Sequence, residues 1–432
     1  MVPPPVGEAV GVAFAAEALD AAFTAAMGRL GPFEPAPLLA VAVSGGSDSM
    51  ALALLADAWA RDRGGRILAL IVDHGLRPAS AVEAAVTRDR LAARGIAARV
   101  LVLSGLGPGT RLAERARAGR YAALEAACAE AGCLHLLTGH QRLDQAETLM
   151  MRALGSSGST GLAGMAALTV LGTVRLLRPL LGQPPAMLRA WLQDRGVDWV
   201  EDPSNVDPRA LRARLRVPAR RADMALAQAA RRAGVARARR ERAIAAELAA
   251  HVSLRPEGFA LLAPVRPSGR FRPEALAAVI QAVAGAPFPP ASTALLSLAA
   301  DPRPATLAGV RLLRAGRFGP GWLMVREPRA VAPAAPVRPG LLWDRRFRLT
   351  GTAPNSWHVA ALGAAAARFG RQAGLPGAVL RTLPAVWDGN SLVAVPHLLY
   401  RAQPISDLCL TFEPGRPMAG APFTPDAGLP LE

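Results

Sequence analysis

Residues 38–50 read Leu-Leu-Ala-Val-Ala-Val-Ser-Gly-Gly-Ser-Asp-Ser-Met, and this stretch decides the fold prediction. The apolar run 38–43 is typical of a buried strand, and an apolar helical pattern begins at Met50. Gly45 and Gly46, which lie between them, permit a sharp turn and leave no Cβ near the backbone amides. The order of these features predicts a strand, a tight turn and the start of a helix.

A helix start of this kind suits a phosphate or pyrophosphate group. Backbone N–H groups, the helix dipole and the hydroxyls of Ser44, Ser47 and Ser49 would converge on one point. Asp48 would repel a phosphate unless a cation lay between them, so the loop also predicts Mg²⁺. A plain turn in which Asp48 caps the helix is the alternative interpretation. The loop that requires Gly-x-x-x-x-Gly-Lys is excluded, because the chain contains no lysine.

Composition narrows the class of protein. The 432 residues suffice for two or three domains, and 51% of them are hydrophobic, which indicates a globular chain. All 50 basic residues are arginine, and the formal net charge of +17 favours a polyanionic partner such as nucleic acid. Three cysteines are too few for a disulfide framework or a zinc site. No apolar run is long enough to span a membrane, so we expect a cytoplasmic protein without a membrane partner.

The pattern along the chain predicts an α/β fold with a parallel sheet and helices on both faces. A helix is expected at 13–30, and four apolar runs then alternate with helical patterns. These runs, the predicted strands, are 38–43, 67–72, 99–103 and 134–138. We predict a catalytic domain over residues 1–216 and a basic helical and α+β domain over 217–328, with a basic helix within 222–250. A linker is expected at 328–339. A C-terminal domain is expected over 340–432, with a strand at 392–395 and a Pro/Gly-rich tail.

Polar residues follow the predicted strands, at the edge of the sheet where ligands bind in such folds. Asp73 and His74 follow the second strand, where they could contact a ribose or base, or Asp73 could simply cap a turn. Residues 138–148, Thr-Gly-His-Gln-Arg-Leu-Asp-Gln-Ala-Glu-Thr, follow the fourth. There Asp144 could help hold the metal, or Glu147 could cap a helix. On the preceding helix, Arg117 and Arg120 could neutralise the charge of a leaving phosphate, or lie on a solvated face.

Several motifs occur in one order over residues 38–216 and together resemble a known family. They are Ser-Gly-Gly-Ser-Asp-Ser at 44–49, Val-Asp-His-Gly-Leu-Arg at 72–77, Ala-Arg-Ala-Gly-Arg-Tyr at 116–121, Thr-Gly-His at 138–140, Asp-Gln-Ala-Glu-Thr at 144–148, Gly-Leu-Ala-Gly-Met at 161–165, Arg-Pro-Leu-Leu at 178–181 and Glu-Asp-Pro-Ser-Asn at 201–205. The first resembles the pyrophosphate loop of ATP pyrophosphatases. The series as a whole resembles the tRNA(Ile)-lysidine synthetases, a family of that superfamily.

The resemblance implies a reaction and its partners. ATP would adenylate the C2 oxygen of the wobble cytidine in tRNA(Ile) with a CAU anticodon, and free L-lysine would displace AMP to give lysidine. It implies roles in catalysis for Asp48, Arg117 and His140, and Mg²⁺ ligation by Asp48 and Asp144. ATP would be bound by residues 44–49, Asp73 and His74, and tRNA by Arg212 and Arg216, with the C-terminal domain as a further tRNA-binding region. A homodimer is one possible assembly that the sequence leaves open.

The chain departs from the family pattern at three positions. Gln141 replaces a histidine, Leu143 replaces an aspartate, and Ala213 follows Arg212 where the family has asparagine. Three other functions remain open. A tRNA thiolase of the same superfamily would need a reactive cysteine, and a small-molecule amide synthetase would not need the basic charge. A non-catalytic RNA-binding protein would not need an intact Asp48 and His140.

Overall fold

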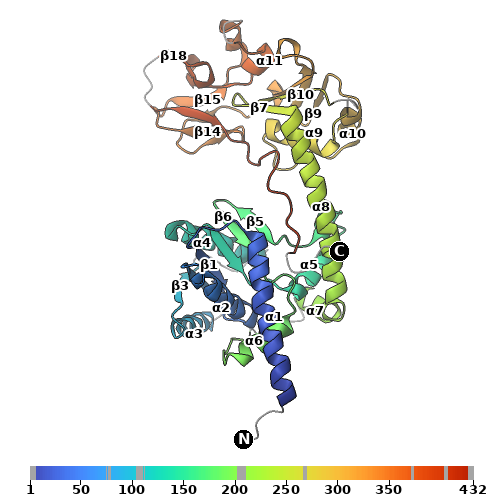
Figure 1. The fold of residues 1–432 in the computed structure, drawn as a ribbon. Coiled ribbons are helices and arrows are strands. Elements are labelled where there is room, and N and C mark those ends of the chain that lie inside the picture. The colour runs from blue at the N-terminus through green and yellow to red at the C-terminus, as the bar shows by residue number, and fades with distance from the viewer. Residues whose placement is uncertain are drawn as a thin grey trace. The chain divides into compact units, whose positions relative to one another are not determined.

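A computed structural model describes residues 6–73, 75, 79–103, 110, 112–201, 211–265, 270–370, 374–402 and 407–426 (Figure 1). The contacts within the chain divide it into two units. Unit 1 comprises residues 1–239 and 423–432, and unit 2 comprises residues 240–422. The three-domain division expected from the sequence stays a prediction, although the contacts group residues 240–422 together.

Unit 1 is built on a six-stranded sheet with the strand order β3-β2-β1-β4-β6-β5. The strands are β1 (Leu38–Val43), β2 (Arg66–Asp73), β3 (Ala97–Val102), β4 (His135–Thr138), β5 (Leu168–Leu171) and β6 (Val174–Leu177). The first five in spatial order are parallel, and β5 is an antiparallel edge strand that forms a hairpin with β6. The four strands predicted from the sequence are confirmed, with bounds that shift by at most two residues.

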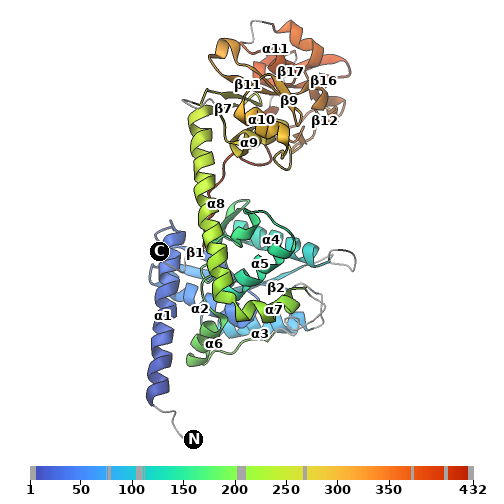
Figure 2. The same cartoon turned by 90° about the vertical axis from the view of Figure 1, so that its right-hand side faces the viewer.

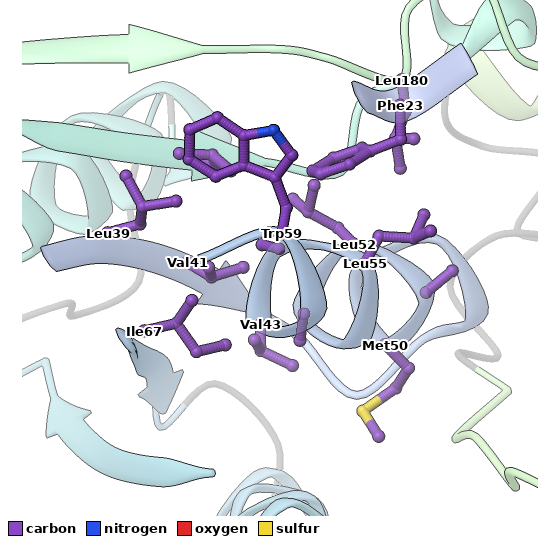
Figure 3. Close-up of a cluster of buried hydrophobic side chains, with 14 of the residues drawn as sticks. Phe23, Leu39, Val41, Val43, Met50, Leu52, Leu55, Trp59, Ile67 and Leu180 are labelled. Carbon is purple, nitrogen blue, oxygen red and sulfur yellow. The ribbon is translucent and has the colours of Figure 1, made fainter. Parts of the chain in front are cut away.

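Alternating residues of the strands face two separate cores. Leu39, Val41 and Val43 of β1 lie in one cluster with side chains of α1 (Val6–Leu30), α2 (Ser47–Arg61) and α6 (Pro185–Asp194). Figure 3 shows part of this cluster. Ala40 points to the opposite face, where it packs with Leu124 and other residues of α4 (Leu112–Ala131). Because strand side chains alternate, a sheet covered on both faces needs apolar residues at every position. This explains the uninterrupted apolar run of β1.

The helices of unit 1 surround this sheet, and the first half of α8 belongs to it as well. They are α1 (Val6–Leu30), α2 (Ser47–Arg61), α3 (Ser80–Ala92), α4 (Leu112–Ala131), α5 (Arg142–Leu154), α6 (Pro185–Asp194), α7 (Leu211–Arg221) and α8 (Asp223–His251), with a 3-10 turn η1 (Gly161–Ala163). α7 packs along α5 through Leu143, Ala146 and Ala219 (Figure 2). The basic helix predicted within 222–250 is confirmed as α8.

Unit 2 contains antiparallel sheets. One has the order β7-β8-β11-β10-β9, a second has the order β12-β15-β16-β17-β18, and a third has the order β13-β14-β19. The strands are β7 (Val252–Arg255), β8 (Phe259–Leu262), β9 (Ala305–Leu307), β10 (Val310–Arg314), β11 (Trp322–Arg326), β12 (Ala335–Pro336), β13 (Leu342–Trp343), β14 (Phe347–Thr350), β15 (Trp357–Ala361), β16 (Pro384–Asp388), β17 (Ser391–Val395), β18 (Tyr400–Arg401) and β19 (Cys409–Phe412). The helices are α9 (Pro273–Ala284), α10 (Thr293–Ala300) and α11 (Gly377–Leu380), with 3-10 turns η3 (Gly316–Phe318), η4 (Pro328–Ala330), η5 (Gly363–Arg368) and η6 (Pro396–Leu398).

The segment predicted as a linker, 328–339, is part of this folded unit. Ala335 and Pro336 pair with β15, and Val337 is buried in the adjacent core. Its proline-rich composition suits an edge strand, because proline lacks the N–H group that an interior strand must donate. Composition alone therefore gave the wrong interpretation of this segment.

A buried ionic cluster joins parts of unit 2 that are distant in sequence. Asp344 accepts hydrogen bonds from Arg326, from Arg346 and from the Ala332 amide. Arg346 is 1% exposed and also donates to the Gly258 carbonyl at 3.2 Å. Burial lowers the pKa of Arg346 to about 10, and the Asp344 charge opposes this shift.

Among the helices of the described residues, none is both long and apolar enough for a membrane span.

Candidate active site

The loop between β1 and α2 has the turn that its sequence predicts. Gly45 has a positive φ of 86°, and a Cβ there would clash with the Thr87 hydroxyl of α3. Gly46 is the N-cap residue of α2, in an extended conformation, and provides no side-chain cap. A helix start without a side-chain cap leaves backbone N–H groups for another acceptor, which is the feature of an anion site.

The serines of the loop hold its shape. The Ser49 hydroxyl donates to the Gly46 carbonyl at 3.0 Å and accepts from the Ser44 amide at 3.1 Å. The Ser44 and Ser49 hydroxyl oxygens are 3.3 Å apart, and Ser47 Oγ donates to Asp48 Oδ1 at 3.2 Å. Ser47 and Ser49 are buried. The small polar side chains thus brace the turn from inside, next to the helix start.

Two further segments pack directly on this loop. A Cβ at Gly139 would lie 3.0 Å from the Asp48 carbonyl oxygen and 3.1 Å from the Ser49 nitrogen, so the β4–α5 loop touches the start of α2. On another side, the Val200 amide donates to the Gly45 carbonyl at 2.8 Å. The Thr-Gly-His motif and the segment just before Glu201 are therefore brought to the phosphate-type loop, as their sequence resemblance suggests.

His140 lies in the β4–α5 loop with its ring held by β4. Its Nδ1 is 3.0 Å from the Thr138 hydroxyl, which can donate to the Leu177 carbonyl at 3.4 Å. When Thr138 donates to Leu177, its oxygen accepts a hydrogen bond from the Nδ1–H group of His140. This pairing fixes the ring orientation and favours the tautomer protonated on Nδ1.

Asp48 and Asp144 form a pair of interacting carboxylates. The pKa of Asp48 is raised to about 6, first by burial and then by the negative charge of Asp144. The Ser47 hydrogen bond and the charges of Arg189 and Arg216 act in the opposite direction. A half-buried carboxylate beside a second carboxylate is the charge pattern that a divalent cation relieves.

This donor set fits Mg²⁺ bound together with phosphates. Across the described ranges, no group of three or more His, Cys, Asp or Glu side chains could hold a metal ion. Mg²⁺ is usually held by one or two carboxylates, with substrate phosphates and water completing its coordination. Asp48 and Asp144 would supply those carboxylates, so the residues agree with a cation that arrives with a nucleotide.

Two of the three residues that depart from the family pattern, Gln141 and Leu143, have structural roles here. Gln141 is the buried N-cap of α5, and its Oε1 accepts from the Leu143 amide at 2.6 Å. Asp144 Oδ2 accepts in return from the Gln141 amide at 2.9 Å, which makes a reciprocal capping box. Leu143 is buried against α7. The prediction that Glu147 caps this helix is wrong, because Asp144 does so.

Glu147 is instead paired with an arginine. It is 2% exposed, and Arg216 Nε lies 3.8 Å from its Oε1. The packing of α7 on α5 brings Arg216 to this position, within electrostatic reach of Asp48. Arg189 of α6 acts on Asp48 as well and pairs with Glu201 at 3.7 Å. Arg189 could not be predicted from the sequence, since nothing in an amphipathic helix distinguishes one surface arginine from another.

Arg117 and Arg120 lie on α4, next to Tyr121. Their guanidinium groups are 5.3 and 5.4 Å from the Tyr121 ring centre. The charge of Arg117 reaches Arg178, whose pKa is lowered mainly by burial. Arg178 follows β6, at the same sheet edge as Thr138. The structure thus gathers positive charge at this edge, on the β6 side of the Asp48–Asp144 pair.

Asp73 is engaged within its own loop. The buried carboxylate Oδ1 accepts from Ser80 Oγ at 2.6 Å and from the Gly75 amide at 2.9 Å. This agrees with the capping interpretation, and its role toward a nucleotide stays a prediction. His74 and residues 202–205 lie outside the described residues, as does the side chain of Arg212.

Comparison with known proteins agrees with this geometry. A model of the PP-loop domain family matches residues 19–220, so the fold and the loop define a PP-loop ATP-binding domain. The tRNA(Ile)-lysidine synthase of Ruegeria pomeroyi is 36% identical over 382 residues, which cover 84% of this chain and 89% of that protein. The chain belongs to the tRNA(Ile)-lysidine synthase family. The resemblance described from the sequence motifs is confirmed.

Two further matches cover less of the chain. The tRNA(Ile)-lysidine synthase of a Bradyrhizobium species is 42% identical over 187 residues, so this chain matches about half (52%) of that relative's length and 43% of its own. A solved structure, the U34-tRNA thiolase of Methanococcus maripaludis, is 15% identical with a TM-score of 0.41 over 49% of this chain and 75% of that chain. A likeness at that level carries no argument about function.

Proposed function

We propose that this protein ligates lysine to C2 of the wobble cytidine of tRNA(Ile) with a CAU anticodon, and forms lysidine, AMP and pyrophosphate from ATP. The observation that carries the proposal is the Gly45–Gly46 helix start beside the Asp48–Asp144 pair, in a chain of the tRNA(Ile)-lysidine synthase family. The N–H groups of the helix start bind the phosphates of ATP, and Ser44 and Ser49 keep them in place.

In the first step the C2 oxygen of cytidine attacks the α-phosphorus of ATP, and pyrophosphate leaves. Mg²⁺ held by Asp48 and Asp144 would supply positive charge to the phosphates. The loop amides stabilise the negative charge that develops on pyrophosphate, and Arg117 adds positive charge from the side of α4. Asp73 and His74 would contact the nucleoside part of ATP.

In the second step the lysine ε-amine forms a bond to C2, and the C2–O bond breaks to release AMP. The amine gives up a proton, and His140, with its orientation fixed by Thr138, lies in the loop that touches Asp48 and is suited to accept it. Adenylation is needed because an amide-type oxygen is a poor leaving group until it becomes a phosphate ester.

The net positive charge of the chain, +17, supports an RNA as its partner. Arg216 of α7 lies beside the site, where it pairs with Glu147. Arg212 belongs to the same helix, and in this proposal both arginines and the basic C-terminal region bind the tRNA. The loop and both carboxylates come from one chain, so the proposal holds for a monomer, and a homodimer would leave it unchanged. We expect activity in the cytoplasm, where ATP, free lysine and tRNA meet.

The proposal is tested by incubating the protein with ATP, labelled lysine and unmodified tRNA(Ile) that carries CAU. Label in the tRNA, dependent on ATP, supports it. The matched control is Asp89→Asn, which changes an exposed carboxylate paired with Arg88 on α3 and should keep full activity. Release of AMP without transfer of lysine to the tRNA would tell against it.

The thiolase alternative is not favoured by the cysteines. Cys128 and Cys133 are buried in the core on the α4 face of the sheet, before the start of β4. Burial raises the pKa of Cys128 to about 12 and also raises that of Cys133. A thiol in this state is a poor nucleophile. Cys409 is exposed but belongs to unit 2.

A further inference from the structure

The chain returns to unit 1 after it has formed unit 2. Met418 packs against a core of unit 2, and residues 423–426 are again part of unit 1, so residues 419–422 make the connection. We call residues 423–426 the C-terminal clasp. The chain therefore passes between the two units twice. It enters unit 2 within α8 and returns to unit 1 at the clasp.

The clasp is anchored by Phe423 on the first half of α8. Phe423 is 7% exposed and packs with Ala163 and Ala238. A Cβ at Gly234 would lie 2.8 Å from the Phe423 ring and 3.2 Å from Pro425, so only glycine permits this approach. Gly234 is the single glycine in the 29 residues of α8. Glycine weakens a helix interior, and the fit of the Phe423 ring provides a physical reason for it.

Polar contacts hold the clasp on its other side. The Ala167 amide donates to the Thr424 carbonyl at 2.8 Å. The Arg237 guanidinium lies 4.6 Å from the centre of the Phe423 ring and also donates to the Thr160 carbonyl at 3.1 Å. Arg237 therefore contacts both the clasp and the segment 160–167.

The segment 160–167 is in turn fixed to the helix that carries Asp144. Gln145 donates to the Met165 carbonyl at 3.0 Å and accepts from the Met165 amide at 2.7 Å. Arg152 donates to the Gly161 and Gly164 carbonyls at 2.8 and 2.6 Å. The clasp thus binds a surface that is itself braced against α5.

We propose that the C-terminal clasp is a second tether that limits the motion of unit 2 and thereby strengthens the binding of an RNA that contacts both units. The proposal rests on the proposed function for the RNA contact on both units. A ligand that bridges two tethered parts binds more tightly when the tether keeps those parts within reach, because the second contact then has a higher effective concentration.

Two variants release the clasp by different means. Phe423→Ala removes the anchor. Gly234→Ala places a methyl group against the ring, while alanine favours the α8 helix over glycine, so lost helix stability cannot explain its effect. Phe423→Leu keeps an apolar side chain as the anchor. This variant should therefore keep most of the clasp binding of the wild-type protein. The matched control is Gly28→Ala in α1, where a Cβ has no neighbour within 4 Å.

Each variant is measured in the full-length chain by hydrogen exchange and by the binding of two RNAs. Hydrogen exchange of the Ala167 amide reports whether the clasp is bound. Filter binding then compares whole tRNA(Ile) with its anticodon stem-loop, which contains the target cytidine and lacks the rest of the RNA. We expect faster exchange in both release variants, a dissociation constant for whole tRNA raised on the order of tenfold, and an unchanged constant for the stem-loop.

Unchanged exchange in Phe423→Ala would contradict the clasp itself. Equal losses for both RNAs would contradict the tether, since they would indicate damage to the site in unit 1. Unaltered affinity for whole tRNA despite fast exchange would also overturn it. A wild-type protein that binds tRNA but transfers no lysine would contradict the proposed function, and the binding comparison would still decide the role of the clasp.

Discussion

The two units differ in how their charge and chemistry are distributed. Unit 1 has 29 arginines against 23 carboxylates over its 249 residues, and unit 2 has 21 arginines against 10 carboxylates over 183. Unit 1 concentrates its polar side chains at strand ends, where the loop that contains His140 packs on the start of α2 and Asp144 interacts with Asp48. Unit 2 has most of the excess positive charge of the chain. Within it, the buried Asp344 carboxylate accepts hydrogen bonds from Arg326 and Arg346. The difference suggests reaction chemistry in unit 1 and a large share of the RNA attraction in unit 2.

The largest effect is expected for Asp48→Ala in unit 1. The change removes a proposed metal ligand beside the phosphates, so formation of AMP and pyrophosphate should fall by about 100-fold or more. Binding of tRNA should change little. Both are measured with the purified variant, after circular dichroism has shown a native fold. Turnover at the wild-type rate would remove Asp48 from the mechanism.

Asp344→Ala is expected to damage unit 2 and spare unit 1. It leaves the buried Arg326 and Arg346 without their shared carboxylate, which should cost about 3–5 kcal/mol of the free energy of unfolding of unit 2. Thermal unfolding should then show an early transition, while ATP binding by unit 1 persists. Simultaneous loss of both would indicate that the two units do not unfold independently.

The basic helices α7 and α8 should determine part of the salt dependence of tRNA binding. Arginines release condensed counterions from RNA phosphates, so replacing the exposed Arg214, Arg220, Arg221 and Arg232 by glutamine should flatten the slope of log K against log salt. A reduction of the slope by about 3 is expected if all four contact phosphates. An unaltered slope would place the RNA surface elsewhere, with unit 2 as the first candidate.

A smaller effect is expected when the pH is lowered. The free energy of unfolding should then decrease in both units. Burial lowers the pKa of His135 in unit 1 and of His397 in unit 2, so each fold prefers the neutral ring. Below about pH 6.5 the unfolded chain takes up the proton first, and the free energy of unfolding should fall. In unit 1, His135 faces Glu34 and Arg175, and Glu34 opposes the shift. Thermal unfolding at pH 8 and pH 5.5 measures this effect, and His397→Asn should reduce it in unit 2 alone.

The smallest effect on activity is expected from replacing Cys128, Cys133 and Cys409 by alanine. Two of these thiols are buried packing groups and the third lies in unit 2, so lysine transfer should stay close to that of the wild type. A modest loss of stability is expected from the two buried sites. A folded triple variant that still forms AMP but no longer modifies the cytidine would favour the thiolase alternative.

Much of unit 1 could be predicted because its signals are local. The apolar strands and the turn at Gly45–Gly46 depend on residues adjacent in sequence, and the parallel topology places the strand ends at one edge. The short strands β5 and β6 were missed, because four-residue runs carry a weak pattern. The segment 328–339 was misinterpreted for a related reason, since a proline-rich edge strand and a linker have the same composition.

The details of the site depend on contacts between distant segments, and sequence patterns do not contain them. The pairing of the buried Glu147 with Arg216 depends on α7, which packs along α5. The influence of Arg189 on Asp48 likewise requires α6 to lie beside α2. The clasp is the clearest case, because Gly234 has its explanation in a ring that is 189 residues further along the chain.

The most direct test of the account is the stoichiometry of the reaction with the full-length protein. With ATP, labelled lysine and unmodified tRNA(Ile) bearing CAU, the account predicts one AMP released for each lysine found in the tRNA, all of it at the wobble cytidine when the digested nucleosides are analysed by mass spectrometry. AMP formation with no lysine at that cytidine, or modification that proceeds without lysine, would contradict it.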